Sequence, residues 1–197
     1  MPAAVAKSIH RLESARAVIL VEGRSDQAAL MALAGKLDRD LAAEGVEVVA
    51  MGGATNAGFF LEALGSKGAS LQLAGLCDAA EIGHVQRALA RGGLGPARSR
   101  GELEALGFFI CDPDLEGEMI RAHGVASIER IFAAQGELSA FRTFQRQPPQ
   151  RTRPIEDQLR RFFGTRATRK IRYGALLVEH LDLERMPRPL VTVLQCV

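Results

Sequence analysis

The sequence predicts an α/β fold: a central, mostly parallel sheet of four strands flanked by helices, with a C-terminal helical extension. Three observations predict it. Continuous apolar runs are typical of strands buried on both faces, stretches with helical periodicity alternate with these runs, and glycine turns separate the two kinds of segment. Because a helix crosses between successive strands, the strands are expected to run parallel.

The first two strands lie near the start of the chain. Residues 17–21, AVILV, form a β-branched apolar run that ends at Glu22. Leucines at helical spacing follow and predict a helix that ends before Gly45. Residues 46–51 predict a second strand, after which a glycine pair and another helix are expected. The strand, turn and helix pattern therefore repeats.

The third and fourth strands continue this pattern. Residues 71–77 predict a strand that ends at Asp78, and a helix is expected after it. Residues 107–111, GFFIC, predict the fourth strand, and an acidic cluster follows it at once. Helical spacing then resumes from Leu115, and a further amphipathic helix is expected over residues 127–134.

The composition changes in the last third of the chain. We expect a sheet domain over residues 1–136, with a short N-terminal segment at 1–15, and a basic, mostly helical extension over 137–197 packed on it. Residues 145–154, QRQPPQRTRP, are rich in proline and arginine and predict an extended surface segment. Two helices and a short tail are expected beyond it, the helices over residues 155–163 and 168–181.

The overall composition is that of a soluble globular chain. Its 197 residues are 47% hydrophobic and 24% charged, which is enough for a sizeable core. No apolar run has transmembrane length, and residues 1–16 lack the apolar centre of a secretory signal, so we expect a cytoplasmic protein with no membrane contact. Cys77, Cys111 and Cys196 match neither a disulfide framework nor zinc-ligand pairs, which predicts free thiols.

Carboxylates follow three of the four predicted strands. They are Glu22, Asp78 and the pair Asp114 and Glu116. Since the carboxyl ends of parallel strands meet at one edge of a sheet, these side chains are expected to share a crevice. Carboxylates brought close together repel one another unless a cation neutralises them, and oxygen-only ligands suit Mg²⁺, Mn²⁺ or Ca²⁺ rather than Zn²⁺. The sequence therefore predicts a divalent-metal site.

Each acid also has a purely structural interpretation. Asp and Glu near helix starts cap free amides and interact favourably with the helix dipole. For Asp26, four residues after Glu22, the cap and the metal interpretations both stay open. The turn at Gly52 and Gly53 could bring backbone amides to a phosphate, but glycine turns between strand and helix are common.

Three segments together resemble a known domain. Residues 21–26 (VEGRSD), 75–81 (GLCDAAE) and 113–116 (PDLE) resemble, in this order, the motifs of a TOPRIM domain. This Rossmann-like metal-binding fold is shared by type IA and type II topoisomerases, DnaG-type primases and the overcoming-lysogenization-defect (OLD) family nucleases. The OLD branch fits best, because the pattern extends to the later acidic motif and to a lysine in the C-terminal helical region. The resemblance covers roughly residues 16–181.

The resemblance implies roles for individual residues. Glu22, Asp78 and Lys170 would be catalytic, although Lys170 also reads as an ordinary exposed lysine. The second aspartate of the family's pair is Ala80 here, and Glu81 beside it is a candidate substitute. The metal ligands implied are Glu22, Asp26, Asp78, Glu81, Asp114 and Glu116, with Mg²⁺ or Mn²⁺ as the cofactor.

Two functions follow from the resemblance. The first is a metal-dependent endonuclease of the nucleotidyl transferase/hydrolase class that hydrolyses phosphodiester bonds in DNA. The second, motivated by Ala80, is a non-catalytic or partner-activated module that binds nucleic acid or an ATPase. The sequence contains no GxxxxGK[ST] phosphate loop, so the protein either acts alone, as a stand-alone counterpart of the C-terminal nuclease module of OLD proteins, or works with an ATPase on a separate chain. A topoisomerase-like reaction would depend on Tyr173, the single tyrosine.

A basic region supports a polyanionic partner. Residues 142–172 contain ten Arg or Lys against two acids, a net charge of +8, whereas the whole chain carries +2. Arginines can hold a nucleic-acid backbone while metals act on one phosphate, and the alternative is a solvated helical face. The arginines predicted to bind nucleic acid are Arg142, Arg146, Arg151, Arg153, Arg160, Arg161 and Arg169.

Overall fold

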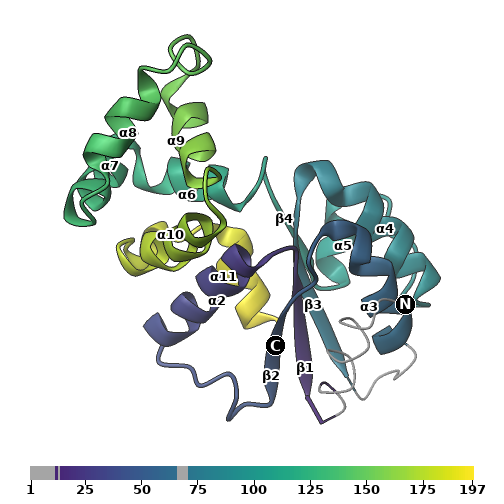
Figure 1. The fold of residues 1–197 in the computed structure, drawn as a ribbon. Helices are drawn as coiled ribbons and strands as arrows, with labels where there is room; N and C mark the ends of the chain where they lie inside the picture. The colour runs from purple at the N-terminus through teal and green to yellow at the C-terminus, as the bar shows by residue number, and fades with distance from the viewer. Residues whose placement is uncertain (1–11, 13, 66–70) are drawn as a thin grey trace.

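A computed structural model describes residues 12, 14–65 and 71–197 and confirms the α/β fold. Four strands form one sheet in the order β2-β1-β3-β4, and every neighbouring pair is parallel (Figure 1). The strands are β1 (Ala17–Val21), β2 (Val46–Ala50), β3 (Gln72–Asp78) and β4 (Phe108–Cys111). Most of the predicted N-terminal segment, 1–15, lies outside the described residues.

Strand β1 is central and its five residues are all buried, as its unbroken apolar sequence predicts. Its register aligns Val21 with Ala50 of β2 and Leu20 with Gly75 of β3. A side chain at Gly75 would place its Cβ 2.7 Å from the Phe108 ring and 2.8 Å from the Leu20 carbonyl oxygen. The glycine therefore permits the close packing of three adjacent strands.

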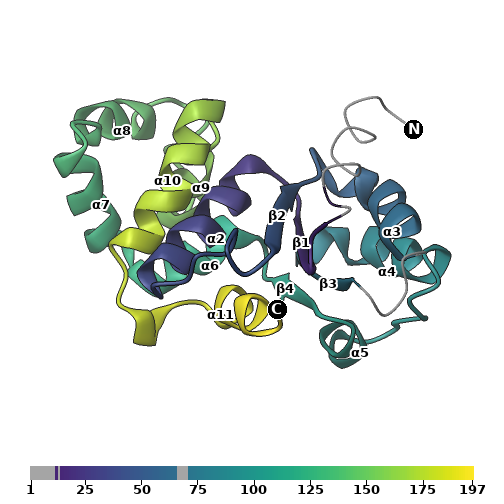
Figure 2. The same ribbon diagram turned by 90° about the horizontal axis from the view of Figure 1, so that it is seen from below.

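Helices cover both faces of the sheet (Figures 1 and 2). Val18 and Leu20 of β1 pack with residues of the helices on one face, whereas Ile19 and Val21 pack with those on the other. The first face carries α3 (Ala57–Gly65), α4 (Ile82–Arg91) and α5 (Arg100–Ala105). The second carries α2 (Arg24–Lys36), α10 (Ala167–Glu179) and α11 (Arg188–Gln195). Short 3₁₀ turns lie at Ala54–Asn56, Ala79–Glu81 and Leu183–Arg185.

Four further helices extend from the second face (Figure 1). We call them the helical lobe: α6 (Leu115–His123), α7 (Val125–Ala134), α8 (Leu138–Gln145) and α9 (Ile155–Phe163). The ring of Phe132 lies 5.1 Å from that of Phe141, 5.2 Å from that of Phe162 and 5.2 Å from that of Tyr173. These contacts cross the predicted division at residue 136, which stays a prediction.

The structure differs from the predicted elements in three helices. Helices α5, α8 and α11 were not predicted, and α11 replaces the expected tail. Ser99 and Glu102 form a capping box at the start of α5, a local sequence signal of a helix start. Pro189 lies in the first turn of α11, where proline is tolerated because the first amides have no partner within the helix.

The predicted extended segment at 145–154 is also wrong. Helix α8 runs to Gln145, and the chain then makes successive turns as far as α9. The side chain of Gln158, buried on α9, donates to the backbone carbonyls of Gln150 (3.1 Å) and Arg153 (2.9 Å). These hydrogen bonds hold the turns in place of an extended conformation.

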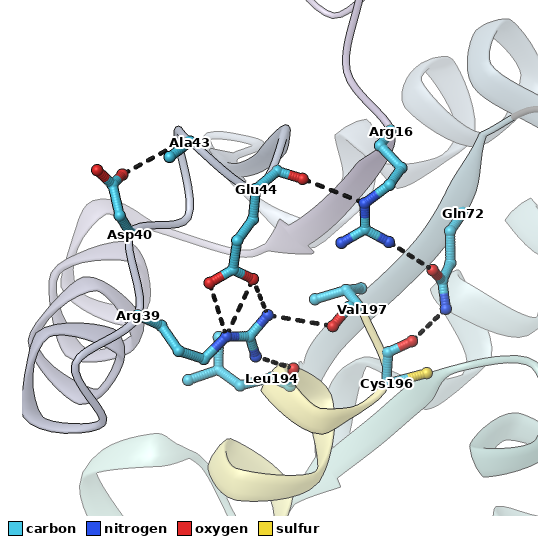
Figure 3. A network of polar contacts seen from close by, with 9 residues as sticks. All are labelled: Arg16, Arg39, Asp40, Ala43, Glu44, Gln72, Leu194, Cys196 and Val197. Atoms are coloured by element: carbon cyan, nitrogen blue, oxygen red, sulfur yellow. Dashed lines mark hydrogen bonds and ion pairs between the residues drawn. The ribbon is translucent and has the colours of Figure 1, made fainter.

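A polar network fixes the end of α11 to the loop between α2 and β2 (Figure 3). The Arg39 guanidinium pairs with the Glu44 carboxylate and donates to the backbone carbonyls of Leu194 and Val197. Arg16 Nε donates to the Glu44 carbonyl at 3.1 Å. The last helix is thus held against the second face of the sheet.

The cysteines are free, with Cys77 and Cys111 buried and Cys196 partly exposed. Tyr173 is buried among aromatic rings, with its hydroxyl 3.5 Å from the Glu137 carboxylate. None of the helices that the structure describes is both long enough and apolar enough to span a membrane.

Helix α10 packs closely on the start of α2 at one glycine. A Cβ on Gly174 would lie 2.5 Å from the Ser25 carbonyl oxygen, and Ser25 is buried. Lys170 lies one helical turn before Gly174, on the same side of α10. The absence of a side chain at Gly174 therefore lets α10 carry Lys170 up to the first turn of α2.

We expect Gly174→Ala to destabilise the protein by about 1–3 kcal/mol, because the added methyl group forces backbone apart in a packed interface. Gly35→Ala is the matched control, since nothing lies within 4 Å of a Cβ at this position of α2. It should be neutral or stabilising by up to about 1 kcal/mol. Chemical denaturation measures both, and equal stabilities for the two variants would contradict the close contact.

Candidate metal centre and nucleic-acid interface

Two strand-end carboxylates face one cavity. Glu22 follows β1, and Asp78 is the last residue of β3, the strand next to β1 in the sheet. Both line a cavity of about 240 Å³ at the carboxyl edge of the sheet, which we call the central cavity. Its other lining residues are Gly23, Ser25, Asp26, Gly52, Gly53 and Lys170.

The backbone of Glu22 is held by the glycine pair after β2. The amides of Gly52 and Gly53 donate to the Glu22 carbonyl at 3.0 and 3.1 Å. Both glycines have positive φ, 76° and 122°, which glycine adopts at no steric cost. These amides are therefore used within the protein and are not free for a phosphate. Among the described residues, nothing forms a hydrogen bond or ion pair with the Glu22 carboxylate.

Asp26 is both a cap and a lining residue. Its carboxylate accepts hydrogen bonds from the Gly23 amide at 2.8 Å and from the Ser25 hydroxyl at 3.4 Å. Burial raises its pKa, and the charge of Glu22 adds to this, whereas the Gly23 hydrogen bond and Lys170 oppose it. The cap interpretation thus describes its geometry, and its place in the central cavity leaves a metal role open.

Asp78 carries the largest electrostatic penalty of these acids. Burial raises its pKa to about 8, and the charges of Asp26, Glu22, Asp114 and Glu116 add to the rise. Its side chain has no hydrogen-bond or ion-pair partner in the part of the chain that the structure describes. The acids that follow three different strands therefore lie close enough for their negative charges to repel one another. A bound cation would reduce this repulsion.

Two basic side chains reach the acids that follow β4. Lys170 Nζ lies 3.2 Å from Glu116 Oε1, and Arg160 Nη2 lies 2.5 Å from Asp114 Oδ2. The other oxygen of Asp114 accepts from the Gly117 amide at 2.8 Å and so caps α6. Asp114 and Glu116 are thus neutralised by residues of α9 and α10.

The charges of Lys170 and Glu116 act on each other. Burial alone would lower the pKa of Lys170, but Glu116, Asp26 and Asp78 together raise it. Burial raises the pKa of Glu116, and Lys170 partly offsets this rise. The lysine is therefore held in its charged form beside the acids.

Glu81 is not brought to the central cavity. Its carboxylate lies 3.6 Å from His84 Nε2, one helical turn along, and it does not line the cavity. Ala80 is exposed in the turn Ala79–Glu81. The structure thus places no carboxylate from this turn next to Asp78.

The donors fit Mg²⁺ or Mn²⁺ by chemical type. Within the described residues, no three or more His, Cys, Asp or Glu side chains form a group that could hold a metal ion. Mg²⁺ is commonly bound through one or two carboxylates and keeps several waters, so it does not require a closed protein cage. Glu22 and Asp78, whose carboxylates have no partner among the described residues, are suitable ligands for such an ion.

Four of the predicted arginines lie away from the acids. Arg142 pairs with both oxygens of Glu129, at 2.8 and 2.7 Å. Arg169 pairs with Glu137 at 2.7 Å, lies 4.1 Å above the Phe162 ring and is only 9% exposed. Arg142 thus connects α8 with α7, and Arg169 connects α10 with the lobe. Arg146 and Arg151 are exposed on the turns after α8, where Arg151 Nε donates to the Arg146 carbonyl.

The other three predicted arginines lie together. Arg153, Arg160 and Arg161 line a cavity of about 430 Å³, which we call the arginine cavity. Arg153 Nε donates to the Pro149 carbonyl at 2.9 Å, and Arg161 has no ion-pair partner within the described chain. Asp114, Glu116, Asp157, Gly164 and Lys170 complete the lining. Lys170 therefore borders both cavities.

Sequence reasoning missed Arg24. This exposed residue lies between Gly23 and Ser25 of the central cavity and lines a further cavity of about 380 Å³ beside β2. A single arginine produces no compositional signal, and only its position inside the VEGRSD segment could have drawn attention to it.

The first part of the chain matches a known family model. Residues 15–79 match the family model described as overcoming lysogenization defect protein-like, TOPRIM domain. This part of the chain is similar to an OLD-like TOPRIM domain. Glu22, Asp26 and Asp78 lie within the matched residues, whereas Asp114, Glu116 and Lys170 lie beyond them. No curated protein matches the sequence.

Solved structures share the fold over nearly the whole chain. The C-terminal region of the Xanthomonas campestris pv. campestris OLD protein is similar with a TM-score of 0.70 and 22% identity, covering 93% of this chain and 92% of that one. The C-terminal region of the Burkholderia pseudomallei OLD protein has a TM-score of 0.64 and 20% identity, covering 92% and 96%. The fold of these regions therefore includes the helical lobe as well as the OLD-like TOPRIM domain.

The raised pKa of Asp78 predicts a pH-dependent stability in the metal-free protein. An acid whose pKa is raised on folding binds more protons in the folded than in the unfolded state between the two pKa values, so stability falls as pH rises through that window. For Asp78 the window extends from the ordinary value of 3.8 to about 8.

We therefore expect Asp78→Asn to be more stable than the parent at pH 8 in EDTA, with a smaller gain at pH 5 because that pH lies near the start of the window. A gain of about 1 kcal/mol would raise the Tm by roughly 2–4 °C in a protein of this size. Asp182→Asn, at an exposed acid outside the cavities, is the control. A Tm difference between Asp78→Asn and the parent that is the same at both pH values would contradict this expectation.

Proposed function

We propose that the protein is a nuclease that hydrolyses phosphodiester bonds in DNA with the help of Mg²⁺ or Mn²⁺. One observation carries the proposal: Glu22 and Asp78, whose carboxylates have no partner in the described part of the chain, face the same cavity as Lys170. The arginine cavity begins at the same lysine and offers guanidinium groups to a phosphate backbone. Acids for a cation and bases for a polyanion thus lie side by side.

Each residue has a distinct task in this proposal. Glu22 and Asp78, with Asp26 beside them, would hold the ion, and Asp114 and Glu116 would form the outer acidic pair. A bound ion supplies charge stabilisation on phosphate oxygens and lowers the pKa of a bound water. Lys170 places a fixed positive charge where negative charge develops, which stabilises the transition state.

Cleavage of supercoiled plasmid in Mg²⁺ or Mn²⁺ tests the proposal. We expect Glu22→Gln and Asp78→Asn each to lower the rate at least about 10²-fold, equivalent to nearly 3 kcal/mol in the barrier. Glu81→Gln is a matched control, since its carboxylate does not line the central cavity. It should keep most of the parent's activity. Equal rates for all three variants would show that the observed cleavage does not use the central cavity.

The role of Lys170 is tested separately. Lys170→Met keeps much of the apolar stem and removes the charge, and we expect kcat to fall roughly 10- to 100-fold, about 1.4–2.7 kcal/mol in the barrier. KM should change less, because the charge acts mainly on the transition state. If Lys170→Met cleaves as fast as the parent while Glu22→Gln is inactive, the lysine has no catalytic role and the metal assignment stands.

A second candidate function is a non-catalytic or partner-activated module. Ala80, and the lack of a three-residue metal group among the described residues, favour it. Calorimetry separates the two candidates. Mg²⁺ or Mn²⁺ binding that disappears in Asp78→Asn, together with cleavage, supports the nuclease. DNA binding that EDTA does not affect, without cleavage in either metal, supports the module, and a separate ATPase chain stays a prediction for its partner.

A further inference from the structure

Three cavities follow the order of the strands across the sheet. The Arg24 cavity lies beside β2, the outermost strand on one side, and includes residues 47–50. The central cavity lies after β1 and β3, the two inner strands. The arginine cavity includes Asp114 and Glu116, which follow β4 on the other side. The acids therefore have a cavity with at least one arginine on each side.

The charge of Arg24 is available on the β2 side. Arg24 is exposed, and within the described chain it forms no ion pair. Gln27, one turn later on α2, donates to the Val48 carbonyl at 2.7 Å and covers part of the edge of β2. Glu47 is the one acid in this lining and matches the charge of Arg24. The two side chains form no ion pair within the described chain, so the Arg24 guanidinium can still pair with a phosphate.

Two arginines are available on the opposite side. Arg153 uses only its Nε in a backbone hydrogen bond, and Arg161 has no ion-pair partner in the described part of the chain. Arg160 differs, since Asp114 neutralises it. Arg142, which connects two helices of the lobe, and Arg169, which connects α10 with the lobe, lie outside this cavity.

We propose that one strand of nucleic acid crosses the central cavity and is held on both sides of it, by Arg24 beside β2 and by Arg153 and Arg161 beside α9. The inference rests on the proposed nuclease function and adds the path of the substrate. A nucleic-acid strand carries about one negative charge per 3.4 Å, so phosphates continue to both sides of the one at the acids. A site with cations on both sides selects an internal phosphodiester bond rather than a chain end.

Binding to single-stranded DNA oligonucleotides tests this path without cleavage. All variants are made in the Asp78→Asn background and measured in EDTA. Each phosphate contact contributes about −0.7 to the slope of log affinity against log salt for single strands. Arg24→Ala should reduce the magnitude of the slope by about 0.7, and the double variant Arg153→Ala with Arg161→Ala by about 1.4.

Arg130→Ala is the matched control, because Arg130 is exposed on α7 and lines none of the three cavities. It removes the same charge and should leave the slope unchanged. Thermal unfolding of each variant checks that the fold is intact. An Arg24→Ala slope equal to that of Arg130→Ala would overturn the inference.

Oligonucleotides with one methylphosphonate, which removes the charge of a single phosphate, locate each contact. Arg24→Ala should no longer weaken binding when the methylphosphonate lies on one side of a central stretch of the oligonucleotide. The double variant should no longer weaken binding when the methylphosphonate lies on the other side. Coupling of both to the same phosphates would overturn the inference. If the methylphosphonate experiments give the expected result while plasmid is never cleaved, the nuclease proposal is overturned and the path stands. If plasmid is cleaved and Arg24 couples to no phosphate, the proposed path is overturned and the nuclease proposal stands.

Discussion

The contact between α10 and the first turn of α2 is the constraint on which the site depends. Gly174 meets the Ser25 carbonyl so closely that no side chain fits between them. Lys170 is carried by the same helix face to Glu116 and to the acids of the central cavity. The lysine comes from the end of the chain and Glu22 from its start, so helix packing completes the site.

The same packing divides the acids into two kinds. Asp114 and Glu116 are neutralised by Arg160 and Lys170, whereas Glu22 and Asp78 have no such partner among the described residues. Burial and mutual repulsion make the second pair costly, most of all at Asp78. Proteins typically tolerate such a loss of folding stability where the unpaired acids are needed to bind a ligand. We therefore expect the inner pair, Glu22 and Asp78, to be the better metal ligands.

Local pattern predicted the sheet and the strand-end acids, because a buried parallel strand such as β1 is recognisable from its own residues and its end fixes the position of Glu22. It missed α5, although Ser99 and Glu102 form a capping box there. Local pattern could not show that Arg142 forms an ion pair with Glu129 and Arg169 with Glu137, because the partners lie far apart in the sequence. The predicted metal roles stay predictions, and the site's geometry came only from the fold.

Ala80 lies where the motif that this segment resembles has its second aspartate, and this affects how many metal ions the site can bind. The turn after β3 provides no second carboxylate at the central cavity, so a second cation would depend on Asp114 and Glu116. Both acids already hold a basic side chain, and a cation would have to displace Arg160 or Lys170 from them. Displacing Lys170 would also remove the charge assigned to the transition state. We therefore expect a first ion to bind at Glu22 and Asp78 and a second to bind more weakly, in competition with these two ion pairs.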